Sequence, residues 1–216
     1  QLQFMMKAFD VYDNLCDVSK LFYEISVPEA HTGKTIQFSD EKNDQDYSFK
    51  VTVSPIYAGE YKVTSSKFRD GKTYKFSSTP GEFNAQQSEF FVEPAECTAG
   101  QIVYAKIVPY DTYKNLIIPS QREKRPFRVE YKHQDETQYK DLGACTIETV
   151  TFKEQNYEGY VFSQNLTIRD TNDFKAFIDQ TSVGCTFGVC QVKVNPDVMS
   201  FLDSDFKRTV DDSDEV

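Results

Sequence analysis

The stretch Phe9-Asp10-Val11-Tyr12-Asp13-Asn14-Leu15 returns later in the chain as Tyr110-Asp111-Thr112-Tyr113-Lys114-Asn115-Leu116. Both copies follow the pattern aromatic-Asp-x-Tyr-x-Asn-Leu, and their starts at 9 and 110 lie 101 residues apart. A second echo, between Phe91-Val92-Glu93-Pro94 and Lys193-Val194-Asn195-Pro196, has the nearly equal offset of 102. Recurrence at one spacing is typical of tandem units. The chain of 216 residues therefore divides into two domains of about 100 residues each, with a predicted boundary near Pro94.

Between the repeated motifs, hydrophobic and polar residues alternate. Residues 47–53 show this most clearly, and a period of two predicts a half-buried strand. The chain holds 18 Phe and 13 Tyr but no Trp, and aromatic side chains favour pleated surfaces. Helical signals are weak and confined to residues 20–24 and 197–207. The pattern predicts an all-β protein of two tandem antiparallel β-sandwiches.

In each copy of the repeated motif, an Asp and an Asn bracket a predicted turn at the end of a strand. Asx side chains bond nearby backbone amides and tolerate left-handed geometry, so they end strands well. The Tyr between them is expected to lay its ring over the edge of the sandwich. Calcium is the weaker alternative, because two oxygen side chains fall short of the ~6 ligands that it prefers. The predicted structural turn motif comprises Asp10, Tyr12, Asn14, Asp111, Tyr113 and Asn115.

The charge balance narrows the classes of partner. The chain has 34 acidic and 24 basic side chains, a formal charge of −10. This excess argues against nucleic acid, because a backbone binder needs a surplus of Lys and Arg. No apolar run approaches the ~18 residues of a membrane span. Residues 198–216 read as an acidic linker or tail, with an acidic contact for a basic partner or a cation as the alternative.

The first unit resembles the filamin-type immunoglobulin-like repeat. That family has an Asp-x-x-Gly-Asn turn, a strand similar to residues 47–55, a Gly-x-Tyr strand matched by Gly59-Glu60-Tyr61, and a closing strand matched by residues 88–94. The second unit matches more loosely. The resemblance implies two tandem immunoglobulin-like (filamin-type) sandwich domains over residues 1–94 and 95–197.

Two departures from the family pattern stand out. Asp13 and Lys114 occupy the usual glycine position of the turn. The first unit is also expected to start at its second strand, because residues 2–9 align with residues 103–110. A sandwich without its first strand exposes an edge, which is a liability. Either the sequence starts inside a domain or a neighbouring molecule donates the strand.

The cysteines and one sequon bear on the compartment. Five cysteines are present without a Cys-x-x-Cys pair, and Cys185 and Cys190 flank a loop that a disulfide would pin. Two reduced thiols are the alternative, with Cys190 packed as a small hydrophobe. Asn165-Leu166-Thr167 is a possible N-glycosylation site. Together these features favour an oxidising, extracellular or cell-surface setting over a cytoplasmic or cytoskeletal one.

No pattern of catalytic residues is present in the sequence. The only histidines, His31 and His133, read as solvated surface residues, and the nine glycines form no phosphate-binding loop. We therefore expect no enzyme activity, no catalytic residue, no cofactor and no metal ligand.

Three functions remain open. The first is a structural or adhesion segment of a larger extracellular or cell-surface protein, with neighbouring repeats or copies of the same chain as protein partners. The second is a cytoplasmic cytoskeletal or ciliary scaffold. The third is a carbohydrate-binding module that uses exposed aromatic rings. In filamin-like repeats partner peptides add beside the third strand, which the resemblance places at residues 127–131 of the second unit.

Overall fold

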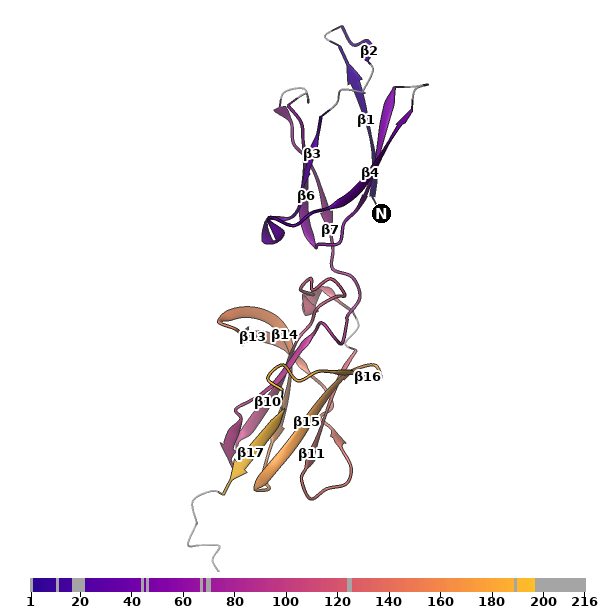
Figure 1. The fold of residues 1–216 in the computed structure, drawn as a ribbon. Coiled ribbons are helices and arrows are strands. Elements are labelled where there is room, and N and C mark those ends of the chain that lie inside the picture. Colours follow the sequence, from indigo (N-terminus) through magenta and orange to yellow (C-terminus); the bar gives the residue numbers. More distant parts are fainter. Residues whose placement is uncertain are drawn as a thin grey trace, which may run out of the picture.

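The computed structural model describes residues 2–196, except residues 11, 17–21, 44, 46, 67, 69–70, 124–125 and 189. The expected acidic tail at residues 198–216 and the helical signal at 197–207 lie outside this range. Of the other helical signal, at 20–24, residues 22–24 are described and none of them is helical; Glu24 opens a strand. The described residues form two β-sandwiches arranged end to end (Figure 1). Among them, no helix is both long and apolar enough to cross a membrane.

The first sandwich faces one sheet of four strands against one of three. Its core consists of Ile25, Val51, Val53, Tyr61 and Val63, all buried. Alternation along residues 48–54 supplies two of these, as the period of two predicts. The four-stranded sheet has the order β2 (Leu15–Cys16), β1 (Leu2–Phe9), β5 (Ser48–Ser54), β4 (Gln37–Asn43), and the other β3 (Glu24–Ser26), β6 (Gly59–Thr64), β7 (Tyr74–Ser78); a short 3-10 turn, η2, spans Glu29–His31.

The second sandwich is the larger of the two and has the larger set of buried core residues. Its main core lies between the sheets and includes Phe90, Ile107, Val129 and Phe162. Every strand pair is antiparallel except β9 with β17, which is parallel. One sheet has the order β13 (Thr146–Phe152), β14 (Gln155–Asn165), β10 (Ile102–Val108), β8 (Glu89–Glu93), and the other β12 (Lys140–Asp141), β11 (Phe127–His133), β15 (Asp170–Ile178), β17 (Gln191–Asn195), β9 (Glu96–Thr98), with β16 (Thr181–Val183) beside β15 and a 3-10 turn, η4, at Pro119–Gln121.

The predicted domain boundary at Pro94 is wrong. Strand β8 lies before Pro94 but pairs with β10, where Phe90 stands opposite Ile107. The chain then crosses to the other sheet, where β9 pairs with β17. Residues 89–98 are thus the first strand of the second sandwich, and the echo between residues 91–94 and 193–196 relates the first strand of that sandwich to its last. The two units meet in the linker, which we define as residues 79–88.

The first sandwich shows no counterpart of β8 among its described strands. Strand β1 pairs with β5 along residues 2–7 and with β2 only at Ala8 and Phe9. Along residues 2–7, the edge of β1 opposite β5 has no strand of the described chain beside it. In the same way β7 pairs only with β6, whereas β17 of the second sandwich has β9 beside it.

Gly159 tests the packing of the second sandwich. A Cβ atom at this position in β14 would lie 2.7 Å from the Ile107 carbonyl oxygen and 2.8 Å from Cγ2 of Val150. Because the first of these is backbone, Gly159→Ala is expected to lower the free energy of unfolding of the second sandwich by about 1–3 kcal/mol. Urea denaturation followed by amide NMR signals of each sandwich measures this. Gly184→Ala is the matched control, since no atom lies within 4 Å of its Cβ position; an equal loss in both variants would contradict the packing explanation.

Candidate functional site at the joint between the sandwiches

Both copies of the repeated motif fold into the same turn. In the first, Asp10 Oδ1 accepts the amides of Tyr12 and Asn14 at 2.8 and 2.9 Å, and Oδ2 accepts the Asn14 side-chain amide at 2.9 Å. In the second, Asp111 accepts the same three donors, from Tyr113 and Asn115, at 2.8–2.9 Å. The Asp is therefore the acceptor that organises each turn, and the Asn closes it.

One detail of the turn differs from the prediction made for its Tyr rings, and another explains a departure from the family pattern. The Tyr rings do not lie over the sandwich edge: Tyr12 is 82% exposed and Tyr113 57% exposed. The tight turn directs these side chains outward, so this prediction is wrong. Asp13 and Lys114 each have φ of +62°, the left-handed conformation for which the family uses glycine.

The second turn forms hydrogen bonds with a loop of the first sandwich. Asn115 Nδ2 donates to the carbonyl oxygen of Ile56 at 2.8 Å, and Asn115 Oδ1 accepts the amide of Ala58 at 2.8 Å. Ile56 and Ala58 belong to the loop between β5 and β6. One side-chain amide thus pairs with a carbonyl and an amide two residues apart, as a neighbouring strand would.

The loop that Asn115 contacts is held in shape by its own sandwich. The hydroxyl of buried Tyr61 accepts the amide of Tyr57 at 3.0 Å and donates to the carbonyl oxygen of Tyr57 at 2.8 Å. The His31 ring stacks on the Tyr57 ring with centroids 4.5 Å apart. His31 is therefore a packing residue at the joint and only partly exposed, in contrast to the expected solvated loop residue.

The linker is fastened to the second sandwich along its length. The Gly81 amide donates to Asp111 Oδ2 at 2.8 Å, and Arg122 donates to the carbonyl oxygens of Pro80 and Gly81 at 2.6 and 2.8 Å. Phe83 packs edge-on against Phe127, with ring centroids 5.3 Å apart. These contacts give the linker a fixed path.

The Asp and the Asn of the second turn are both buried, and this affects the pKa of the Asp. Asp111 is 2% exposed and Asn115 3% exposed. Burial by itself raises the pKa of Asp111, but the hydrogen bonds from the Asn115 side chain and from the Gly81, Asn115 and Tyr113 amides outweigh it, so the pKa lies below 3.8. Asp111 is therefore a buried carboxylate with four donors. We define Asp111, Asn115, the linker and the Ile56–Ala58 loop as the joint.

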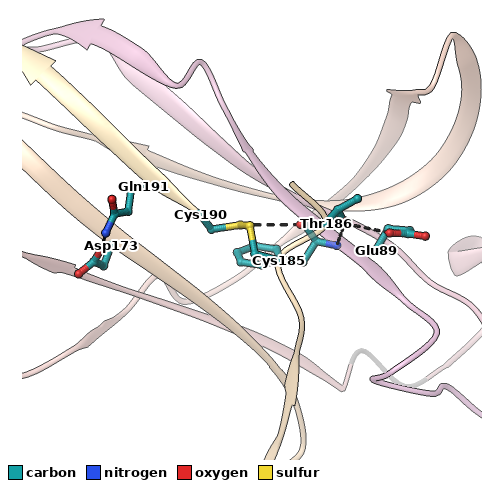
Figure 2. Close-up of a disulfide and its surroundings, with 7 residues drawn as sticks. Glu89, Asp173, Cys185, Thr186, Cys190 and Gln191 are labelled. Carbon is teal, nitrogen blue, oxygen red and sulfur yellow. Dashed lines mark hydrogen bonds between the residues drawn. A yellow bond between two sulfur atoms is a disulfide. The ribbon is translucent and has the colours of Figure 1, made fainter. Parts of the chain in front are cut away.

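A disulfide loop contacts the first strand of the second sandwich, β8 (Figure 2). Cys185 and Cys190 form the disulfide, and Thr186 between them accepts the Phe90 amide at 2.9 Å and donates to Glu89 Oε2 at 3.0 Å. The other oxygen of Glu89 lies 2.7 Å from Lys114 Nζ, in the turn. Hydrogen bonds and an ion pair thus connect the disulfide loop to β8 and β8 to the turn.

The remaining predicted positions lie away from the joint. Asn165 is exposed at the end of β14, and its glycosylation stays a prediction. Cys16, Cys97 and Cys145 lie outside the disulfide, and burial raises the pKa of the Cys97 thiol. His133 was expected on the surface but is 6% exposed, with Nε2 donating to the Arg169 carbonyl oxygen at 2.8 Å.

The described residues contain no cluster of three or more His, Cys, Asp or Glu that could hold a metal ion. The calcium alternative for the turn is also unsupported by its geometry, since both Asp111 oxygens are already occupied by N–H donors.

Comparison with known proteins supports the fold at low sequence identity. No protein-family model matches the sequence, and no curated protein matches it. Similar solved structures are the adhesin FdeC of Escherichia coli (16% identity, 92% of this chain and 59% of that one, TM-score 0.55), InvD of Yersinia pseudotuberculosis (11%, 94% and 54%, 0.53) and invasin, a bacterial integrin-binding protein (9%, 90% and 36%, 0.50). The chain therefore spans roughly a third to three fifths of these structures, and it shares with them a tandem immunoglobulin-like fold. The filamin type is not established and rests on the sequence motifs.

Asn115→Ala is expected to loosen the joint. The Ala58 amide loses its acceptor, so its hydrogen exchange should accelerate by about tenfold or more, which corresponds to loss of one hydrogen bond of ~1.4 kcal/mol. Amide exchange followed by NMR measures this. Asn14→Ala is the matched control, because it removes the same residue from a turn that makes no contact with Ala58 in the described structure. Unchanged exchange at Ala58 in Asn115→Ala would refute the role of this side chain.

The stability of the joint is also expected to depend on pH. Because the folded-state pKa of Asp111 is lowered, its stabilising contribution is complete above the unfolded value and is lost as the pH falls through the lowered value. The Gly81 amide chemical shift, which senses Asp111 Oδ2, should titrate with a midpoint below 3.8, the ordinary value of an Asp carboxyl. Asp111→Asn should abolish this titration. A midpoint above 3.8 would contradict the assignment.

Proposed function

We propose that this chain is a non-enzymatic spacer and adhesion segment of a larger extracellular or cell-surface protein. The observation that carries the proposal is the joint. The buried side chain of Asn115 in the second sandwich pairs there with partly buried backbone groups of the first, and the linker between them has a fixed path. Two sandwiches connected in this way hold one orientation instead of moving independently, as loosely linked domains do.

A fixed orientation suits a protein that works by its length and shape. A spacer must present its far end at a defined distance, and each flexible linker would shorten the mean end-to-end distance. Here the linker residues Gly81 and Phe83 are bonded to or packed on the second sandwich. The chemistry needed is protein–protein contact through loops and strand edges, with no cofactor.

The disulfide supports an oxidising compartment. Bridges such as Cys185–Cys190 persist in secreted and surface proteins and are rare in the cytosol. The fold shared with FdeC, an adhesin, and with invasin, a bacterial integrin-binding protein, is in keeping with this location. Assignment of both sandwiches to the filamin type, and a glycan on Asn165, belong to the same proposal.

A cytoplasmic scaffold is the second candidate, favoured by the three cysteines outside the disulfide. A reducing compartment would leave all five cysteines as thiols, so the state of Cys185 and Cys190 separates the two candidates.

Surface labelling and intact mass test the proposal. Antibodies against the chain should label intact source cells, and protease added to those cells should remove the signal. Protein purified from them with thiols blocked should gain about 2 Da on reduction, the mass of the two hydrogens that convert one disulfide to two thiols, at Cys185 and Cys190. Labelling that appears only after permeabilisation, together with five blocked thiols, would overturn the surface location and favour the scaffold.

A further inference from the structure

The turn of the first sandwich is a copy of the joint with part of its bonds unused. Asn115 donates both side-chain hydrogens, to Asp111 and Ile56, and accepts from Ala58. Asn14 makes the Asp10 bond, but the described residues supply no counterpart of Ile56 or Ala58. Asn14 is exposed where Asn115 is buried. The same geometry is therefore present with one donor hydrogen and one acceptor directed to solvent.

Asp10 shows the same difference. Asp111 Oδ2 accepts two donors, the Asn115 side chain and the linker amide of Gly81. Asp10 Oδ2 accepts only the Asn14 side chain within the described structure. Within the described residues, Asp10 thus lacks a counterpart of the linker amide that is the fourth donor to Asp111.

The edge of β1 is incomplete in a matching way. With the offset of 101, Phe4 and Met6 correspond to Ala105 and Ile107. Ala105 and Ile107 are 1% and 0% exposed, because β8 pairs beside them and Phe90 stands opposite Ile107. Phe4 and Met6 are only partly buried against the first core. The uncovered edge and the unused turn lie on the same strand and its adjoining turn.

We infer that β1 and the Asp10–Asn14 turn together form an acceptor for another immunoglobulin-like sandwich, which precedes the first in the polypeptide and is joined to it by a strand of the β8 type. A loop of that sandwich supplies a carbonyl oxygen and an amide to Asn14. Its linker supplies an amide to Asp10 and then a strand along residues 3–6. This inference rests on the proposed function as a segment of a tandem array.

The register of β8 on β10 specifies the chemistry of the incoming strand. Phe90 faces Ile107 and Val92 faces Ala105. The incoming strand therefore carries a large apolar residue opposite Met6. Phe4 is much larger than Ala105, so the residue opposite it must be smaller than Val92 if the same space is filled without strain. The strand is thus antiparallel, with a large apolar residue and a small one two positions later.

A chain with three sandwiches tests the inference. Residues 1–101 are duplicated ahead of residue 1 of the full chain, with the Val92 of the duplicate changed to Ala. The Ala58 amide of the duplicate is expected to be protected from exchange by Asn14. Asn14→Ala in the original first sandwich should accelerate exchange of the duplicate Ala58 amide by about tenfold or more and leave the original Ala58 amide protected. Asn115→Ala should have the converse effect and is the matched control.

Two outcomes of this experiment overturn the inference. The first is exchange of the duplicate Ala58 amide at the unprotected rate with Asn14 intact. The second is protection that Asn14→Ala does not change. In either case the original joint, probed by Asn115→Ala, still reports on the proposed spacer, so failure of the acceptor is distinguishable from failure of the proposed function.

A peptide experiment with the unmodified chain gives a readout that needs no new fusion to fold. A peptide of residues 87–98 with Val92→Ala, added at up to millimolar concentration, should shift the amide signals of residues 3–6 and show contacts between its Phe90 and Met6. A peptide that also carries Phe90→Asp should shift none of them. No shift with the first peptide, or equal shifts with both, refutes the strand acceptor. Shifts confined to the β7 edge would instead identify a different peptide site and also refute it.

Discussion

The structure depends on one buried carboxylate. Asp111 is almost fully enclosed and would be costly to bury without donors. Its four donors come from two places, the turn itself and the linker amide of Gly81. Asn115, which one of these bonds orients, carries the contact to the first sandwich. The turn, the linker and the loop of the other sandwich are thus ordered together, since removing any one leaves polar groups of the others unsatisfied.

The same seven-residue motif has two different environments in this chain. Its internal bonds are the same within 0.1 Å in both copies, so the turn is a local structure that does not need a neighbour. What differs is the surroundings: Asn115 is buried by another sandwich, and Asn14 is exposed. The turn orients the polar groups locally, and the neighbouring sandwich forms hydrogen bonds with the donor and acceptor that the turn itself does not pair. This separation explains how one motif can be both a strand terminator and a contact surface.

How far the sequence predicts the structure follows from the range of each interaction. The Asp–Asn turn and the alternation in residues 48–54 act over a few residues, and both are readable from sequence. The boundary is not, because Phe90 belongs to the second sandwich only through its pairing with Ile107. The burial of His133 depends on the Arg169 carbonyl, 36 residues away. The contact of Asn115 with Ala58 spans 57 residues and has no signal in the sequence beyond the repeat itself.

The chemistry of the Asn side chain determines how general such a joint is. A carboxylate at position 115 has no donor for the Ile56 carbonyl oxygen, and an aliphatic residue has neither donor nor acceptor. The amide supplies both, and it bonds only backbone atoms of the loop. Backbone atoms are the same whatever the side chains are, so the joint requires a loop conformation more than a loop sequence. Sandwiches can therefore diverge in sequence and still stack in the same way, provided that a residue such as Tyr61 holds the loop in shape.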